Sequence, residues 1–203
     1  MPRVIAIDGP VGSGKSTIAQ AVGARLGLAV LGTGSMYRAV AVAALRRGIE
    51  PGPATAEALA ALAAEVTVEG ERVRVGGEDV TDELRNPEVN QAVSAVSATR
   101  QVRAELVQRQ REWAEEHGGG VVEGRDIGTI VFPDAELKVF LTADEEERAR
   151  RRGGDEDAAG LARRDHLDST REVSPLSAAE HALVIDSTGL SVEEVVDVIV
   201  SHL

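Results

Sequence analysis

The chain has 203 residues, no cysteine and a formal net charge of −12. This length is enough for one domain with a buried core, and the missing cysteines exclude disulfides and thiol chemistry. The excess of acidic residues argues against general binding to nucleic-acid polymers or acidic membranes. No apolar run reaches the roughly 18 residues that a membrane helix needs, and an apolar strand pattern already begins at Val4, so we expect a cytoplasmic protein without a secretory signal.

The most informative stretch directly follows the apolar run 4–7. It has the G-x-x-x-x-G-K-[ST] spacing of a P-loop, in which backbone N–H groups surround a phosphate at the start of a helix. In this motif Lys15 reaches the β- and γ-phosphates and the Ser16 hydroxyl coordinates Mg²⁺. The residues expected to bind ATP are Gly9, Pro10, Val11, Gly12, Ser13, Gly14, Lys15, Ser16 and Thr17.

The lysine in this motif stands out against the composition of the chain. Lys15 and Lys138 are its only lysines, and arginine supplies the remaining positive charge. A compact ammonium at position 15 therefore favours a phosphate site. The alternative is a glycine-rich turn between a strand and a helix that binds nothing.

The next segments continue a β–α alternation. Apolar residues at helical spacing predict a helix that Gly27 closes, and residues 28–31 predict a buried strand. A polar turn with Thr33, Ser35 and Tyr37 follows and leads into an alanine-rich helix that ends near Gly48. In an open α/β sheet such a turn faces the ligand crevice, although Thr33 or Ser35 as a helix cap is the simpler interpretation.

The period changes in the middle of the chain. After a short helix at 55–64, residues 66–75 alternate between apolar and polar around Gly70, which predicts an antiparallel hairpin. We interpret 65–90 as an insertion into the β–α chain. Two helical patterns follow, at 88–97 and 99–116, and Gly118 to Gly120 predict a break before the next strand.

The second informative stretch is 121–129, a buried strand followed by acidic residues, glycine and arginine. A P-loop enzyme needs a carboxylate at such a strand end to bind Mg²⁺ through water, and Glu123 is the weaker candidate for this role. Arg125 and Asp126 either contact a ligand or form an exposed pair without a role.

The last part of the chain contains two arginine-bearing helical patterns. A strand at 137–141 precedes a helix at 144–152, a polar stretch at 153–157 and a second helix with Arg163 and Arg164. Two such helices joined by a flexible loop suit a lid that closes over phosphates, and a solvated hairpin is the alternative. A final strand at 182–185 brings the count to five, which predicts a three-layer α/β/α domain with a parallel sheet.

Three stretches together closely resemble bacterial cytidylate kinases, a family of nucleoside monophosphate kinases. They are Ile7-Asp8-Gly9-Pro10 with its P-loop, Gly124-Arg125-Asp126-Ile127-Gly128-Thr129, and Asp168 with Arg171 before Pro175-Leu176. The resemblance implies a five-stranded P-loop kinase fold and ATP-dependent phosphorylation of CMP and dCMP in pyrimidine metabolism. It implies one domain, with its core at about 1–64, 91–147 and 168–203, a nucleotide-binding insertion at 65–90 and a lid at 148–167.

The resemblance also implies roles for individual residues. Thr33 and Tyr37 lie beside the acceptor nucleotide, and Ser94, Arg103 and Asp126 recognise cytosine. Arg125 holds the acceptor phosphate, and Asp168 and Arg171 contact the pentose and phosphate. Arg148 and Arg152 border ATP in the lid. The catalytic set is then Lys15, Arg125, Arg148, Arg152 and Arg171, with Ser16 on the metal.

Two other classes of function stay open at this point. One is a P-loop kinase for another small acceptor, such as UMP, AMP or a sugar acid. The other is a nucleotide-dependent switch, although no Asn-Lys pair for a guanine reader occurs. We expect a monomer that needs no protein partner.

Overall fold

The computed structural model describes residues 2–151, 158–170 and 174–203 and divides into two compact units. The first unit contains residues 1–31 and 114–203, and the second contains residues 32–113. The predicted polar stretch at 153–157, Arg152 and Arg171 lie outside the described residues. No helix among the described residues is long and apolar enough to cross a bilayer.

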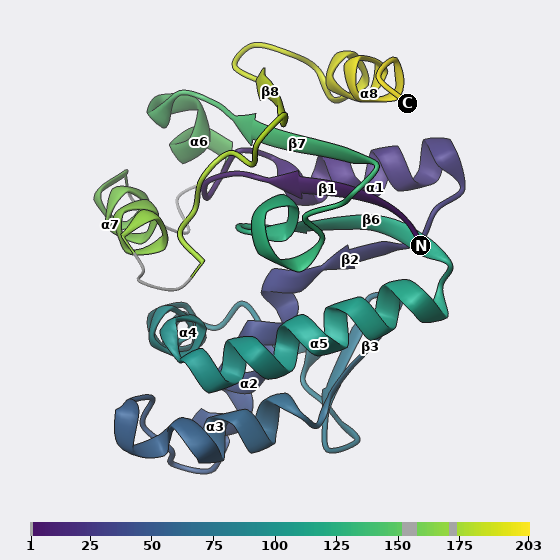
Figure 1. Ribbon diagram of the computed structural model, residues 1–203. Coiled ribbons are helices and arrows are strands. Elements are labelled where there is room, and N and C mark those ends of the chain that lie inside the picture. The colour runs from purple at the N-terminus through teal and green to yellow at the C-terminus, as the bar shows by residue number, and fades with distance from the viewer. Residues whose placement is uncertain (1, 152–157, 171–173) are drawn as a thin grey trace. The chain divides into compact units, whose positions relative to one another are not determined.

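The first unit is an α/β structure around a five-stranded sheet with the order β2-β6-β1-β7-β8 (Figure 1). β1 pairs in parallel with β6 and β7, and β7 pairs in parallel with β8. The predicted α/β fold with five parallel strands is therefore confirmed. Its elements are β1 (Arg3–Asp8), α1 (Lys15–Leu26), β2 (Val30–Gly32), β6 (Gly119–Gly124), a π-helical turn (Ile127–Val131), β7 (Leu137–Thr142), α6 (Glu145–Arg151), α7 (Ala158–Ser169), β8 (Leu183–Asp186) and α8 (Val192–Val200).

The core of this unit explains the apolar patterns of its strands. Ile5 and Ile7 of β1 are fully buried and pack with α1 and α8 on one face of the sheet. Central parallel strands are buried on both faces, and so they read as continuous apolar runs. β1 is such a strand, and it places the P-loop at its carboxyl end, where α/β sheets bind their ligands.

Two boundaries differ from the prediction. β2 begins at Val30 rather than at residue 28. The predicted glycine break is wrong in part, because Gly119 and Gly120 already belong to β6. A Cβ at Gly119 would lie 2.1 Å from the carbonyl oxygen of Arg3, so glycine is needed there for the close approach of β1.

The second unit is built around α2, which packs against α3, α4, β3 and β4. The predicted hairpin is confirmed, because β3 and β4 pair antiparallel and β5 extends them to a three-stranded sheet. The elements of this unit are α2 (Thr33–Arg46), a 3₁₀ turn (Pro53–Thr55), α3 (Ala56–Ala63), β3 (Val66–Glu69), β4 (Arg72–Val75), β5 (Glu78–Asp79), a second 3₁₀ turn (Thr81–Glu83), α4 (Pro87–Ala98) and α5 (Arg100–Glu116).

The start of α2 corrects one interpretation of the sequence. Gly32 is the N-cap, with no side-chain cap hydrogen bond, and Thr33 is the first helical residue. Ser35 lies inside the first turn and donates its hydroxyl to the Gly32 carbonyl at 2.7 Å. The interpretation of Thr33 or Ser35 as an N-cap is therefore wrong.

Candidate active site

The P-loop connects β1 to α1 and depends on glycine at its beginning and its end. A Cβ at Gly9 would lie 2.0 Å from the carbonyl oxygen of Leu141, on the neighbouring strand β7. Gly14 has a φ of 89° directly before α1, a left-handed conformation that other residues rarely adopt. These two positions let the backbone run close to the sheet and then turn its N–H groups toward an anion.

Lys15 is buried inside this loop, with only 6% of its surface exposed. Its Nζ donates to the carbonyl oxygen of Pro10 at 2.7 Å and to Ser13 Oγ at 3.4 Å. Burial, followed by the nearby Arg125 guanidinium, lowers the pKa of Lys15 to about 7. A phosphate group beside Nζ would supply the negative charge that favours the protonated form.

Glu123 lies beside the residue predicted to bind the metal. The Ser16 hydroxyl donates to Glu123 Oε1 at 2.8 Å, and Glu123 itself is 9% exposed. A hydroxyl and a carboxylate are hard oxygen ligands of the kind that Mg²⁺ prefers. The donor set therefore fits the ion, and the structure favours Glu123 more strongly than its sequence position did.

Arg125 brings together two segments that are far apart in the sequence. Its Nη1 donates to the carbonyl oxygen of Gly9 at 2.9 Å, and its Nε donates to Asp168 Oδ2 at 2.8 Å. The parallel register pairs Asp8 with Gly124, so Arg125 lies just past the strand end and beside the P-loop. Two predicted substrate residues, Arg125 and Asp168, are thus in direct contact.

Arg148 contacts the P-loop from α6. Its Nη1 donates to the carbonyl oxygen of Val11 at 3.1 Å and pairs with Asp165 of α7. Asp165 Oδ1 also accepts the backbone N–H of Val11 at 3.1 Å. No sequence motif marks Asp165, because the contact joins residues 154 positions apart.

Arg151 makes a second contact from α6. Its Nη1 donates to the carbonyl oxygen of Ser13 at 3.2 Å and to Ser187 Oγ at 2.9 Å, and its Nη2 donates to the Ser187 carbonyl at 2.8 Å. Ser187 directly follows β8 and is 3% exposed. A serine in a loop carries no motif, so Ser187 was not identified from the sequence.

Four cationic side chains therefore surround one loop. Lys15, Arg125, Arg148 and Arg151 donate to the carbonyl oxygens of Pro10, Gly9, Val11 and Ser13, respectively. These side chains come from α1, from the end of β6 and from α6. Such a concentration of positive charge around backbone N–H groups is suited to a polyphosphate.

The second unit holds the residues predicted to lie near the base. The Arg103 guanidinium lies 5.6 Å from the ring centroid of Tyr37, and both side chains are buried. Arg103 also donates to the Ser97 carbonyl at 3.3 Å, and Ser97 Oγ donates to the carbonyl of Ser94. Thr33 is buried at the start of α2, one turn before Tyr37. These contacts lie within the second unit, and Asp126 belongs to the first.

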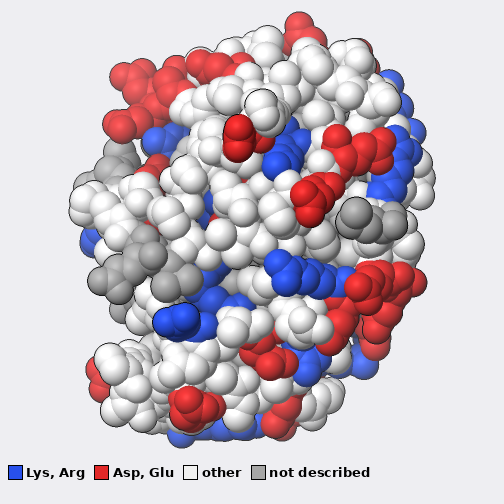
Figure 2. All heavy atoms as spheres, in the orientation of Figure 1, with Lys and Arg blue, Asp and Glu red and all other residues white. Residues whose placement is uncertain are grey.

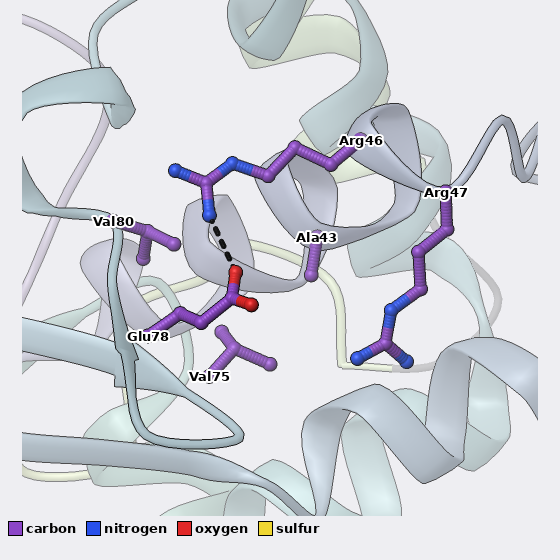
Figure 3. Close-up of a pocket in the computed structure, with 6 residues that line it drawn as sticks. All are labelled: Ala43, Arg46, Arg47, Val75, Glu78 and Val80. Atoms are coloured by element: carbon purple, nitrogen blue, oxygen red, sulfur yellow. Dashed lines mark hydrogen bonds and ion pairs between the residues drawn. The ribbon is translucent and has the colours of Figure 1, made fainter.

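A pocket of about 230 Å³ in the second unit is lined by none of these residues (Figure 3). Arg46 points toward Glu78 and forms an ion pair of 2.9 Å with it. Arg47 pairs with Glu65 at 3.7 Å. Both arginines of this pocket pair with carboxylates, and no P-loop residue lines it, so we do not assign the phosphate site there.

Comparison with known proteins identifies the family. The sequence matches the Cytidylate kinase family over residues 5–203. The chain belongs to the cytidylate kinase family. It is 50% identical to a cytidylate kinase of Mycolicibacterium paratuberculosis, over 96% of this chain and 92% of that protein. A cytidylate kinase of Geobacter sulfurreducens is 48% identical, over 96% of this chain and 89% of its own length.

The cytidylate kinase family confirms the predicted enzyme class, a phosphotransferase that acts on cytidylate. Solved structures support the fold alone. TT1252 from Thermus thermophilus has a TM-score of 0.54 at 22% identity, covering 100% of this chain and 98% of its own. An uncharacterized protein from Eubacterium ventriosum has a TM-score of 0.53 at 15% identity, covering 98% of this chain and 97% of its own.

Proposed function

We propose that this chain transfers the γ-phosphoryl group of Mg-ATP directly to the phosphate of CMP or dCMP. An oxygen of the acceptor phosphate forms the new bond to the γ-phosphorus while the bond to ADP breaks. A phosphate monoester is already a competent nucleophile near neutral pH, so no general base is needed. The protein contributes alignment and charge neutralisation.

The observation that carries this proposal is the group of four cations around the P-loop. Within it, Lys15 neutralises the β- and γ-phosphates, and Arg148 with Arg151 borders ATP from α6. Arg125 lies at the carbonyl of Gly9, the first residue of the loop, and it holds the phosphate of the acceptor. Arg152 and Arg171, outside the described residues, complete the proposed set.

The metal is assigned to Ser16, with Glu123 as its neighbour. Mg²⁺ bound there would neutralise charge on the transferring phosphates. Glu123 accepts a hydrogen bond from the Ser16 hydroxyl, which leaves the lone pairs of the Ser16 oxygen for the ion. Position 123 therefore belongs with the proposed metal site, beyond the single ligand predicted from the motif.

Base recognition is assigned to Ser94, Arg103 and Asp126, with Thr33 and Tyr37 beside the nucleotide and Asp168 at the pentose. Arg103 and Asp126 offer a donor and an acceptor to a base edge. Uracil, with its two carbonyl groups, would leave one buried polar group unpaired, which is a strong basis for rejection. Tyr37 supports Arg103 through the cation–π contact.

The test is ADP formation from Mg-ATP with CMP, dCMP, UMP, AMP and GMP offered separately. Turnover confined chiefly to CMP and dCMP is the expected result. A different preferred nucleotide would overturn the base-recognition residues and leave the P-loop assignments standing. Nucleotide binding without any turnover that depends on an acceptor would favour the switch.

A further inference from the structure

Asp8, the last residue of β1, has no role in the phosphate contacts described above. It is 3% exposed, and its two carboxylate oxygens each accept a backbone N–H. Ile127 donates to Oδ1 at 2.8 Å, and Gly128 donates to Oδ2 at 2.7 Å. The carboxylate therefore joins the strand that leads into the P-loop to the chain just beyond Arg125 and Asp126.

This contact holds the segment after β6 at its C-terminal end, residues 127 and 128. At its N-terminal end, Arg125 donates to the carbonyl of Gly9, the residue that follows Asp8. Directly after Asp126 the chain enters a π-helical turn, in which the Asp126 carbonyl accepts the N–H groups of Ile130 and Val131. Residues 125–128 thus donate three hydrogen bonds to residues 8 and 9, one from the Arg125 side chain and two from the backbone.

The surroundings of Gly128 leave little freedom for this arrangement. A Cβ at Gly128 would lie 3.4 Å from Asp8 Oδ2 and 3.3 Å from both Ala179 Cβ and Lys138 Cγ. The two contacts at 3.3 Å are tighter than ordinary packing, so glycine at 128 keeps the backbone in this place without displacing Ala179 or Lys138. The geometry suits two N–H donors facing one ionised carboxylate.

The burial of this carboxylate carries a cost. Burial raises the pKa of Asp8 to about 6, and the negative charge of Asp126 adds to this rise. The two backbone N–H groups and the positive charge of Lys15 lower the pKa and so oppose it. A folded-state pKa above the ordinary value means that the fold loses stability as pH rises from about 4 through 6. The presence of an acid here is therefore better explained by what it positions than by a gain in stability.

We propose that Asp8 is a positioning residue for the acceptor side of the reaction. By holding Ile127 and Gly128, it sets the direction in which Arg125 and Asp126 leave β6. Arg125 is then aimed at the acceptor phosphate and Asp126 at the base. This inference rests on the proposed function, because that function assigns the acceptor to these two residues.

The kinetic test uses Asp8→Asn, which keeps the shape of the side chain. The asparagine oxygen accepts one N–H, but its amide group turns donors toward the other, so one contact is lost. We expect the KM for CMP to rise about tenfold or more, while the KM for ATP stays within about twofold. The matched control is Asp197→Asn, which removes an exposed carboxylate paired with Arg25 and should leave both values unchanged.

A merely structural role gives a different pattern. Loss of folded enzyme lowers kcat and leaves both KM values as they were. That result, or an equal rise of both KM values, would overturn the proposal. Only a selective rise for CMP supports it.

A second measurement does not depend on activity. In the wild-type protein, the amide proton shifts of Ile127 and Gly128 should titrate with a midpoint near pH 6, as Asp8 takes up its proton. The same titration should be missing from Asp8→Asn, which separates it from the titration of Lys15. If these amide proton shifts do not change with pH, the contact of the Asp8 carboxylate with Ile127 and Gly128 is excluded and the proposed function is unaffected. If the amide shifts of Ile127 and Gly128 titrate but the enzyme does not phosphorylate CMP, the proposed function is excluded and the contact of Asp8 with these amides stands.

Discussion

Among single residues, Lys15 shows most clearly how the fold prepares a charge for its ligand. The side chain is held by a carbonyl and a hydroxyl inside the P-loop, and no carboxylate of the described residues lies at hydrogen-bond distance from it. Burial and the positive charge of Arg125 lower its pKa to about 7. In the free protein the Lys15 amine is therefore only partly protonated at neutral pH.

Nucleotide binding should consequently take up a proton. At pH 8 the free Lys15 is mostly neutral, and phosphate groups raise its pKa, so Mg-ADP binding should take up about one proton. Calorimetry in buffers of different ionisation enthalpy measures this number. Lys15→Met should show almost no uptake, and heats that do not depend on the buffer in the wild-type protein would contradict the prediction.

Among the elements, α6 shows why a charge pattern alone does not identify a functional side chain. It has three acids in its first turn and three arginines in its last, an order that suits the helix dipole. Figure 2 shows the acidic side chains gathered over this helix. Arg150 and Arg151 both pair with Glu147 and lower its pKa to about 2, but only Arg151 reaches Ser13 and Ser187.

The two neighbouring arginines make a matched pair of variants. Arg151→Ala should raise the KM for ATP about tenfold, because the P-loop loses the donor to the Ser13 carbonyl. Arg150 is 75% exposed, and Arg150→Ala should change the same KM by less than about twofold. The measurement is the KM for ATP of both variants in steady-state kinetics with saturating CMP. An equal rise of this KM in the two variants would show that α6 acts only through its total charge.

The contact of β1 with β6 gives a prediction for stability. Gly119→Ala places a Cβ against the Arg3 carbonyl at a residue whose φ is 123°, so the strands must separate. We expect a loss of at least about 2 kcal/mol in the free energy of unfolding, measured by urea denaturation. Gly52→Ala, with an extended φ of −175° and no atom within 4 Å of the new Cβ, should stay within about 0.5 kcal/mol.

At the scale of the whole molecule, the chain divides into two compact units. The match to the cytidylate kinase family covers both of them, over residues 5–203. The predicted division into a core, an insertion at 65–90 and a lid at 148–167 stays a prediction. The net charge of −12 gives repulsion between copies at low ionic strength.

We therefore expect a monomer. Light scattering after size exclusion should give about the chain mass of 21.3 kDa, with or without nucleotide. A mass near twice this value at micromolar concentration would contradict the expectation. Titrating salt in the same experiment shows whether charge repulsion contributes, because ions screen it.

The sequence by itself determined the P-loop, the parallel α/β sheet, the antiparallel hairpin and the family. These features depend on local spacing and on apolar periods, which can be read along the chain. The exact beginning of β6 was missed, because the need for glycine at 119 comes from the backbone of Arg3.

Only the tertiary structure decided which residues meet. Three of these pairs are more than a hundred residues apart: Asp8 with Ile127, Ser16 with Glu123, and Asp165 with Val11. The fourth pair, Arg151 with Ser187, is 36 residues apart. No local pattern marks such partners, because the parallel register and the packing of α6 and α7 bring them together. The motif therefore identified the chemistry, and the fold selected the residues that position it.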